Sequence, residues 1–370
     1  MPEPLKNMFS RPLLENFSQQ VYTVWPSFDR TAFLDRVFDP AWAQRELKQR
    51  MRHIAESLRA GLPPAYPAAL DVVTGVAEQW LRTHGEGMKF EYCFIPDFVE
   101  VYGLDDPERS IPALALVTRW CSAEFAVRPF LRRYPERMYP QMLAWSADAS
   151  PMVRRLASEG FRPRLPWGMG VPALKRDPSP VLAVLENLKA DPDETVRRSV
   201  ANNLNDISKD HPTLALDIAR RWLGQHPDTD RLLRHALRGL LKKGHADALA
   251  QFGFDQELSG IAVEHLKVSA AVAVGGVLDF SFSVKNTSGT GRQIRLEYGI
   301  DYRTGSGKTS VKVFKIKEMT LGAGQSDANR KSQRFTDFTT RKHYPGTHRL
   351  RILVNGKEMA EKAFEVQLPG

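Results

Sequence analysis

DPDETVRRSVANNLNDISKDHP, residues 191–212, is the stretch that decides the fold of this 370-residue chain, because it is typical of one capped amphipathic helix. We expect Asp191 to cap the helix, with Pro192 at its first position and Glu194 completing a capping box. Apolar side chains at helical spacing predict a buried stripe, which consists of Val196, Val200, Leu204 and Ile207. The stretch therefore predicts a helix with one buried face and one polar face.

Two polar residues of this helix need an explanation. Asn203 falls inside the apolar stripe, so it needs a hydrogen-bond partner on a neighbouring segment if it is buried. Asp206 lies on the flank of the stripe in the last turns, where a negative charge opposes the helix dipole. The opposite face is polar and consists of Arg198, Asn202, Asn205 and Lys209. The awkward position of Asp206 makes it a candidate functional residue.

A weak internal repeat surrounds this helix. Short helical segments open with a small or acidic residue and then have an aliphatic residue followed by arginine: Val127–Arg128, Val153–Arg154, Val196–Arg197 and Leu233–Arg234. The offsets of 26, 43 and 37 residues are irregular, but they suit degenerate helical pairs stacked into a solenoid. The recurring arginines would then project from equivalent places on a concave surface. Alternatively, they cover helix flanks and pair with nearby acids.

The chain changes character near residue 260. Segments before it follow the helical period; those that begin at Thr31 and Tyr66 end at Gly61 and Gly85, as C-capping predicts. After it, alternating and β-branched segments are separated by turn signals such as NTSGTG and VNGK, which indicates about seven strands. We therefore predict an all-α repeat solenoid over residues 1–258 and an all-β immunoglobulin-like sandwich over residues 259–370.

Composition and charge indicate where the protein works and what it binds. The two cysteines, Cys93 and Cys121, form no disulfide framework, and no secretory or membrane-spanning segment is evident, so a cytoplasmic location is expected. Residues 261–370 contain 18 Lys and Arg against 10 Asp and Glu, so eight of the nine net positive charges lie there. This basic domain suggests an electrostatic grip on nucleic acid, and the alternative is a surface tuned for solubility.

Known cofactor and nucleophile motifs are missing from the sequence. The nine histidines show no metal-ligand spacing, and neither cysteine has a companion at ligand spacing, so no metal is expected. Walker A, dinucleotide-binding and Gly-x-Ser-x-Gly motifs are also lacking, which argues against a nucleotide cofactor or a serine nucleophile. We therefore expect any chemistry to rest on carboxylates and aromatic residues.

Two further carboxylates and one tryptophan are candidates. Glu124 follows an expected N-cap at Ser122, a position that the helix dipole alone explains. Glu159 comes just before an expected C-cap at Gly160, where the dipole opposes it, although nearby arginines could pair with it. Trp167 lies in a loop rich in proline and glycine, where it could plug into a core or stack on a ligand. Several carboxylates beside an aromatic ring and arginines suit stabilisation of a cation next to bound phosphates.

Three motifs give the chain a family resemblance: SAEFAVRPFL (residues 122–131), VRRLASEGFRPRLPW (153–167) and SVANNLNDISKDHP (199–212). In this order they resemble the AlkC family of DNA alkylation-repair glycosylases, relatives of AlkD with HEAT-like helical repeats. The C-terminal domain is similar to the immunoglobulin-like extension of some members. The resemblance implies a HEAT-like solenoid and an active-site group formed by Glu124, Glu159, Trp167 and Asp206.

The resemblance also implies an activity. Family members hydrolyse the N-glycosidic bond of cationic bases in duplex DNA, such as 3-methyladenine and 3-methylcytosine, without fully flipping the base. A cationic base leaves as a neutral molecule, so only the developing sugar cation needs stabilisation, which carboxylates can supply. One carboxylate could also orient or deprotonate the attacking water. Because no lysine is evidently placed for a Schiff base, we expect a monofunctional enzyme that leaves an abasic site and needs no cofactor.

The predicted partner is duplex DNA, and we expect a monomeric protein that binds no membrane. Contacts with the duplex are expected from both domains. The solenoid would hold phosphates near the lesion with Arg154, Arg155, Arg162, Arg164, Arg197, Arg198 and Asn202. The basic domain would grip the duplex with Lys308, Lys312, Lys315, Arg330, Lys331, Arg341 and Lys342. Such a protein would act on the bacterial nucleoid. The alternative is a non-catalytic repeat scaffold that binds DNA or protein, and a carbohydrate-active or adhesion protein is suggested only by the sandwich.

Overall fold

The structure of the protein, a computed structural model, describes residues 3–338 and 342–368. Its chain forms two compact units, one of residues 1–215 and 221–236 and one of residues 216–220 and 237–370. None of the described helices is long and apolar enough to cross a membrane. The order of the elements, helices first and strands afterwards, confirms the predicted fold class.

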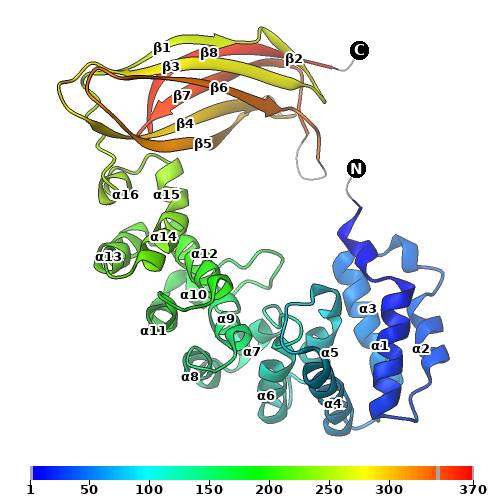
Figure 1. The fold of residues 1–370 in the computed structure, drawn as a ribbon. Helices are drawn as coiled ribbons and strands as arrows, with labels where there is room; N and C mark the ends of the chain where they lie inside the picture. Colours follow the sequence, from blue (N-terminus) through cyan, green and yellow to red (C-terminus); the bar gives the residue numbers. More distant parts are fainter. Residues whose placement is uncertain (1–2, 339–341, 369–370) are drawn as a thin grey trace. The chain divides into compact units, whose positions relative to one another are not determined.

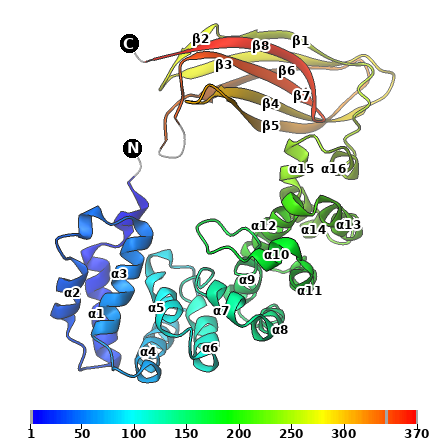
Figure 2. The same cartoon turned by 180° about the vertical axis from the view of Figure 1, so that it is seen from behind.

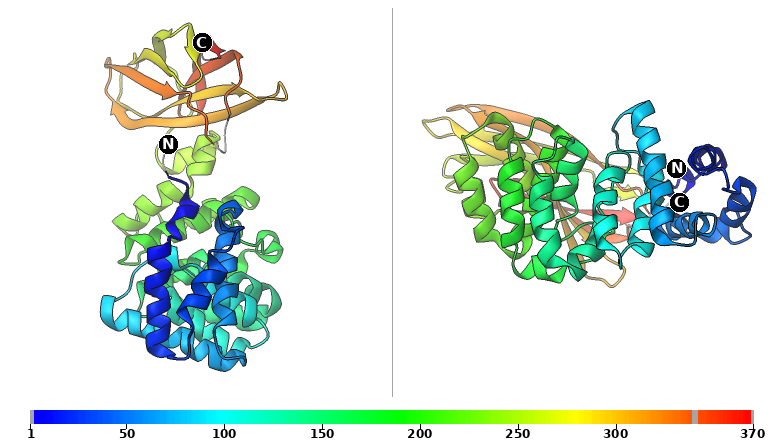
Figure 3. Two further views of the ribbon diagram at one scale, coloured as in Figure 1. Left: turned by 90° about the vertical axis from the view of Figure 1, so that its right-hand side faces the viewer. Right: turned by 90° about the horizontal axis from the view of Figure 1, so that it is seen from below.

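The first unit is built from helices that lie side by side in chain order (Figure 1; right-hand view of Figure 3). They are α1 (Arg11–Val24), α2 (Arg30–Val37), α3 (Leu47–Ala60), α4 (Tyr66–His84), α5 (Phe94–Tyr102), α6 (Pro107–Thr118), α7 (Val127–Arg133), α8 (Pro135–Trp145), α9 (Pro151–Glu159), α10 (Pro172–Arg176), α11 (Ser179–Leu188), α12 (Glu194–Asp210) and α14 (Pro227–Ala236), while α13 (Pro212–Trp222) is shared between the units. Short 3-10 turns add η1 (Leu5–Met8), η2 (Trp42–Gln44) and η3 (Phe90–Tyr92). The predicted ends at Gly61 and Gly85 are confirmed, although the segment from Thr31 forms two helices.

Helix α12 has the predicted buried stripe but a different start. Val196, Val200 and Leu204 are fully buried. The prediction that Asp191 caps the helix is wrong, because Asp193 is the N-cap and its carboxylate accepts from the N–H groups of Thr195 and Val196 at 2.7 and 3.3 Å. A cap two residues later leaves Asp191 available for an ion pair with the preceding repeat.

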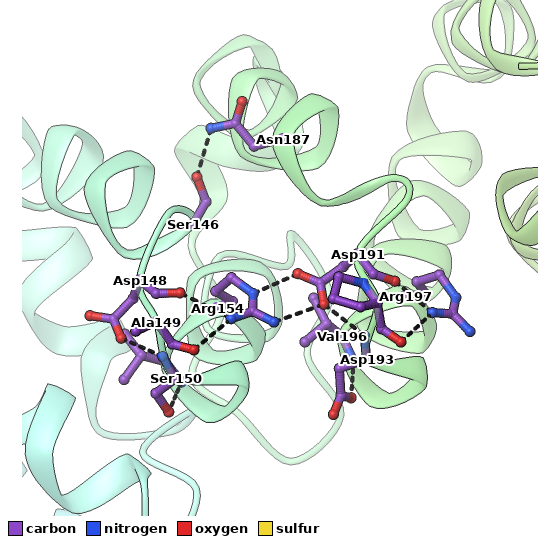
Figure 4. A network of polar contacts seen from close by, with 12 residues as sticks. Ser146, Asp148, Ala149, Ser150, Arg154, Asn187, Asp191, Asp193, Val196 and Arg197 are labelled. Carbon is purple, nitrogen blue, oxygen red and sulfur yellow. Dashed lines mark hydrogen bonds and ion pairs between the residues drawn. The ribbon is translucent and has the colours of Figure 1, made fainter. Parts of the chain in front are cut away.

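Arginines connect successive repeats through this part of the chain (Figure 4). Arg154 on α9 donates to two carbonyls of its own preceding loop and to both carboxylate oxygens of Asp191, at 2.6 and 3.0 Å. Arg197 on α12 repeats the arrangement, because it donates to two carbonyls of its own loop and lies 3.8 Å from Asp228 of the next repeat. Two of the four arginines of the sequence repeat, Arg154 and Arg197, therefore form a ladder of equivalent contacts between successive repeats.

A buried polar contact fixes α12 against α9. The side-chain amide of Asn203, fully buried as its place in the stripe requires, donates to the carbonyl of Ser158 at 2.8 Å. One turn earlier, the hydroxyl of Ser199 meets the hydroxyl of Ser158 at 3.0 Å. Because Ser158 precedes Glu159, this contact sets the distance between the two helices at the place where the candidate carboxylates lie.

The second unit contains two sheets that share one core (Figure 2). The strand orders are β1-β3-β6 and β2-β8-β7-β4-β5, and all pairs are antiparallel except β2 with β8. The strands are β1 (Ile261–Val268), β2 (Ala271–Ala273), β3 (Val277–Asn286), β4 (Arg292–Arg303), β5 (Thr309–Leu321), β6 (Ser326–Arg334), β7 (Gly346–Val354) and β8 (Lys357–Gln367). Phe280 and Phe282 of the first sheet pack with Ile300 of the second, as in a sandwich.

Two short helices, α15 (Arg238–Lys242) and α16 (Ala246–Gln251), belong to the same unit as the strands. Gly244 and Gly356 touch backbone to backbone, and both have a positive φ, so side chains are excluded there. Asn355, in the β7–β8 turn, donates to the carbonyl of Asp255 at 2.6 Å. The segment between the last repeat helix and β1 is therefore fixed to the sandwich.

Candidate active site

Two of the predicted carboxylates share one buried arginine. Arg162, in the turn after α9, donates to Glu159 at 2.6 Å and to Asp206 of α12 at 2.8 Å. All three side chains are at least nine-tenths buried. Burial opposes the charge of Arg162, but the two carboxylates outweigh it and raise the pKa of the guanidinium. The unfavourable interaction of the Asp206 carboxylate with the helix dipole is thus compensated locally, since Arg162 and Lys209 both pair with it.

The third carboxylate lies in a turn before α7. The prediction that Ser122 caps a helix is wrong, because residues 122–126 form this turn and α7 begins at Val127. The hydroxyl of Ser122 instead donates to Glu124 at 2.7 Å. Arg155 of α9 holds both residues, with contacts of 3.0 Å to Ser122 and 2.8 Å to Glu124. Because Arg155 and Glu159 are one turn apart on α9, this helix joins Glu124 to the other pair of acids.

Trp167 lies in the loop between α9 and α10, as predicted, and its side chain is 63% exposed. Its φ of 62° is a left-handed conformation, which is costly for a residue with a bulky side chain. The backbone carbonyl of Trp167 accepts a 2.6 Å hydrogen bond from Lys48 of α3. At Gly168 an added Cβ would lie 2.9 Å from Leu165, so the loop is tight. The surrounding structure therefore holds the indole out toward solvent instead of burying it.

Arg128 of α7 ties these elements together. Its fully buried guanidinium donates to the carbonyls of Gly160 and Arg162, at 2.9 and 2.8 Å, and to the carbonyl of Met169 in the Trp167 loop. Burial, reinforced by the neighbouring charge of Arg162, lowers the pKa of Arg128 to about 10, so it stays protonated at neutral pH. One side chain thus fixes both the end of α9 and the loop that carries Trp167.

The other predicted basic residues of the first unit divide into two groups. Arg154 and Arg197 are engaged in the repeat ladder, which is the alternative that the sequence left open, and Arg162 and Arg155 hold carboxylates. Arg164 forms a two-point pair with Asp210, at 2.9 and 2.5 Å, while keeping 37% of its side chain exposed.

Arg198 and Asn202 lie on the exposed side of α12. Arg198 is 61% exposed and pairs with Glu194, which is 74% exposed, at 2.8 Å. It lines a hollow of about 510 Å³ together with Arg231 and His235 of α14. The side-chain oxygen of Asn202 lies 3.1 Å from the ring of His235. Glu194 and Asp228 also line this hollow and pair with Arg198 and Arg231, so its donors are accompanied by two acids.

The predicted basic residues of the sandwich are on its surface. Lys308 lies in the β4–β5 turn, Lys312 and Lys315 on β5, Arg330 and Lys331 on β6, and Lys342 before β7, and all six are exposed. Lys315 pairs with Glu318 at 3.1 Å. Arg341 lies outside the described residues. Both β5 and β6 are edge strands, so their charges stand at the borders of the two sheets.

Sequence reasoning missed two residues of the site. Arg128 was recognised as part of the repeat, but its inward-facing guanidinium, which donates to three carbonyls, was not predicted. Lys48 is 119 residues away from Trp167, and its contact depends on how α3 packs. An arginine within the apolar run AVRPFL was the available signal for Arg128, because an arginine there must be satisfied by buried acceptors.

The geometry can stabilise positive charge. Glu124, Glu159 and Asp206 all act on Arg128, so the three acids converge on one region of the first unit. Each is held by an arginine that also fixes its direction, and the exposed Trp167 lies on the loop that Arg128 anchors through the carbonyl of Met169. Because Glu159 and Asp206 are buried and paired with Arg162, their charges would act on a nearby cation through the protein and not by direct contact, and they are fixed in place before the cation arrives.

Comparison with known proteins follows the same division of the chain. Residues 262–368 match the family described as "Uncharacterised protein YhaZ, C-terminal Ig-like domain", which confirms the immunoglobulin-like prediction. Over 363 residues the chain is 42% identical to "Uncharacterized protein YhaZ" of Bacillus subtilis (strain 168), covering 98% of this chain and 99% of that protein. It is 38% identical to the structure of Pseudomonas fluorescens alkylpurine DNA glycosylase AlkC bound to DNA containing an abasic site analog, with a TM-score of 0.92 and coverage of 99% and 100%.

Proposed function

Because this chain belongs to the family that includes AlkC and YhaZ, we propose that it is a DNA glycosylase that removes cationic N3-alkylated bases from duplex DNA. The observation that supports this most directly is the convergence of Glu124, Glu159 and Asp206 beside the exposed Trp167. The substrates that we propose are 3-methyladenine and 3-methylcytosine. Hydrolysis would leave an abasic site, and the protein would act as a monomer on nucleoid DNA.

The charges of substrate and site match at each stage of the reaction. Methylation at N3 makes the base a cation, so it departs as a neutral molecule and needs no general acid. As the glycosidic bond lengthens, positive charge develops on the deoxyribose, and the carboxylates stabilise it electrostatically. One of them also orients or deprotonates the water that attacks the anomeric carbon. The role of Arg162 is to hold Glu159 and Asp206 in place before the substrate binds.

Trp167 contributes a π face to the same cation. The indole is held outside the core by its left-handed backbone, so it is available to pack on the deoxyribose. A cation over an indole is stabilised by about 0.5–2 kcal/mol. Packing of the indole on the deoxyribose does not require the base to enter an enclosed pocket. The arrangement is therefore compatible with excision without full base flipping.

Phosphate contacts are proposed for the residues that keep accessible donors. In the first unit these are Arg164, Arg198 and Asn202, whereas Arg154 and Arg197 are assigned to the ladder and Arg155 and Arg162 to the carboxylates. In the sandwich they are Lys308, Lys312, Lys315, Arg330, Lys331 and Lys342. Arg341 stays a prediction from the sequence.

The test is base release from duplex DNA that contains a single 3-methyladenine or 3-methylcytosine. The wild-type protein should release the base, and Glu159→Gln and Asp206→Asn should each lower the rate by about 100-fold or more, as removal of a preorganised charge does in other enzymes. Glu136→Gln, which neutralises an exposed acid on α8, is the matched control and should keep the wild-type rate. If the wild-type protein releases no base from either duplex, the proposed activity is wrong and the non-catalytic scaffold is favoured.

A further inference from the structure

A second charged hollow lies between α3 and α5, on elements that none of the predicted site residues occupies. Its volume is about 460 Å³, and its charged lining includes Arg45, Lys48, Arg52, His53, Asp97 and Glu100. Arg45 is held by Asp39 in a two-point ion pair, so Arg52 and Lys48 are the cations of this hollow that a phosphate group could meet. A phosphate accepts several hydrogen bonds and has a negative charge, which suits a guanidinium and an ammonium group.

One ion pair builds the floor of this hollow. Asp97 is buried, and Arg52 donates to both of its carboxylate oxygens, at 2.7 and 3.1 Å. The Arg52 side chain nevertheless stays 42% exposed. Arg52 is therefore fixed in direction by a buried partner while part of it is accessible to a ligand.

Glu100 competes for the same arginine. Its carboxylate lies 3.5 Å from Arg52, whose other contacts go to Asp97. Burial and the neighbouring Asp97 raise the pKa of Glu100 to about 7, although Arg52 and Lys48 oppose the shift. Glu100 is thus protonated more readily than an exposed glutamate. Glu56 and His53 of α3 also line the hollow, and an incoming anion would meet both.

We propose that this hollow binds a backbone phosphate of the DNA and that Glu100 takes up a proton when the phosphate enters. The proposal rests on the proposed function, because duplex DNA supplies the phosphate. An ionised Glu100 repels a phosphate and occupies Arg52, whereas a protonated Glu100 does neither. Phosphate binding and protonation of Glu100 therefore favour each other, as linkage requires.

Lys48 connects the hollow to the candidate active site. It lines the hollow, its ammonium group donates to the carbonyl of Trp167 at 2.6 Å, and it lies 5.0 Å from the centre of the Phe125 ring. Phe125 follows Glu124 directly. A phosphate in the hollow would therefore lie beside the Trp167 loop, close to the nucleotide that reacts.

The first experiment measures the affinity of the full-length protein for a duplex that contains an abasic-site analogue, at pH 6, 7 and 8 and constant ionic strength. Uptake of one proton predicts that wild-type affinity falls between pH 6 and pH 8 by up to about tenfold. Glu100→Gln should abolish most of this fall and should bind more tightly than wild type at pH 8. Glu78→Gln removes an exposed acid from α4 and should behave like wild type. If Glu100→Gln keeps the wild-type pH dependence, the proposal is overturned.

A second variant locates the effect. Lys48→Gln should lower the slope of log affinity against log salt by about one, as expected when one phosphate contact is lost, whereas Lys89→Gln, an exposed lysine outside the hollow, should not. Equal slopes for the two variants would contradict a phosphate site here. Base release from methylated duplexes is measured separately on the same preparations. Failure of that assay would refute the enzyme, whereas the binding series alone decides the phosphate site.

Discussion

At the scale of single residues, the site depends on buried arginines that face inward. Arg128 donates to backbone carbonyls, and Arg162 lies between Glu159 and Asp206. Buried charges are costly unless they are paired and hydrogen-bonded, so the cluster is stable only when it is complete. This explains how three acids can converge in one region of a protein that must stay folded without substrate.

Arg162→Met should therefore destabilise the fold strongly. Removing the guanidinium leaves two buried carboxylates without their shared partner, and breaking a buried pair costs about 3–5 kcal/mol. Arg164→Met removes the neighbouring but half-exposed pair with Asp210 and should cost less than about 1 kcal/mol. Urea unfolding of both variants at pH 7 measures the difference. Similar losses would show that Arg162 is not a buried charge partner.

Arg128→Met should affect catalysis through the Trp167 loop. Without its donor to Met169, the loop loses its anchor, and small misplacement of reacting groups lowers rates by up to about 100-fold. We expect base release to fall more than affinity for the duplex, and hydrogen exchange over residues 163–171 to accelerate. Arg133→Met, at the exposed end of the same helix, is the control. An unchanged exchange rate in the loop would contradict this role.

At the scale of elements, sequence periodicity predicted much but not the exact helix ends. The stripe of α12 follows from spacing alone, because the burial of Val196, Val200 and Leu204 is a property of one helix. The choice of N-cap was not predictable in this way. Asp191 and Asp193 both have capping chemistry, and the ion pair of Asp191 with Arg154, which lies 37 positions away, leaves Asp193 to cap.

The residues of the candidate site also differ in whether local sequence features could predict them. Glu159, Trp167 and Asp206 could be named from local features, namely unfavourable dipole positions and a stiff loop. Lys48 could not, since its contact with Trp167 exists only after α3 has packed. Partners fixed by tertiary contacts leave no periodic signal in the sequence. The pairing of Glu159 with a nearby arginine was expected, but the second contact of Arg162, with Asp206 on another helix, was not.

Substitutions at Asp191 and Asp193 test which of the two residues caps α12. Asp193→Ala removes the cap and should cost about 1 kcal/mol, whereas Asp191→Ala leaves Arg154 without its carboxylate and should cost more, about 1–3 kcal/mol. Burial opposes ionisation of Asp193, but hydrogen bonds from Thr195 and Val196 lower its pKa below the ordinary value. The cap therefore stabilises at higher pH and is lost as the pH falls through that lowered value. Thermal unfolding at pH 7 and pH 3 should show the Asp193→Ala difference shrinking, and a constant difference would contradict the assignment.

At the scale of the whole molecule, charge and chemistry belong to different parts of the chain. The candidate carboxylates and Trp167 all lie in the first unit, whereas eight of the nine net positive charges lie in residues 261–370. Part of that positive charge is used within the sandwich, where Arg349 and Arg351 pair with Asp301 of β4. Exposed cations on β5, β6 and the β4–β5 turn are left for a polyanion. Affinity and catalysis should therefore be separable by substitution.

The final prediction tests this separation in the full-length protein. The triple variant Lys308→Gln, Lys312→Gln and Arg330→Gln should bind duplex DNA more weakly, with a salt slope smaller by up to about 0.9 per lost phosphate contact. Its control, Lys267→Gln, Lys357→Gln and Lys362→Gln, removes three exposed lysines from other strands of the sandwich and leaves the same net charge. Base release at saturating protein should stay near the wild-type rate in both, because the carboxylates are untouched. If the slope of log affinity against log salt falls equally in the two triple variants, the position of the substituted residues is irrelevant and only net charge matters. A smaller slope in the first alone would place the duplex contact on β5, β6 and the β4–β5 turn.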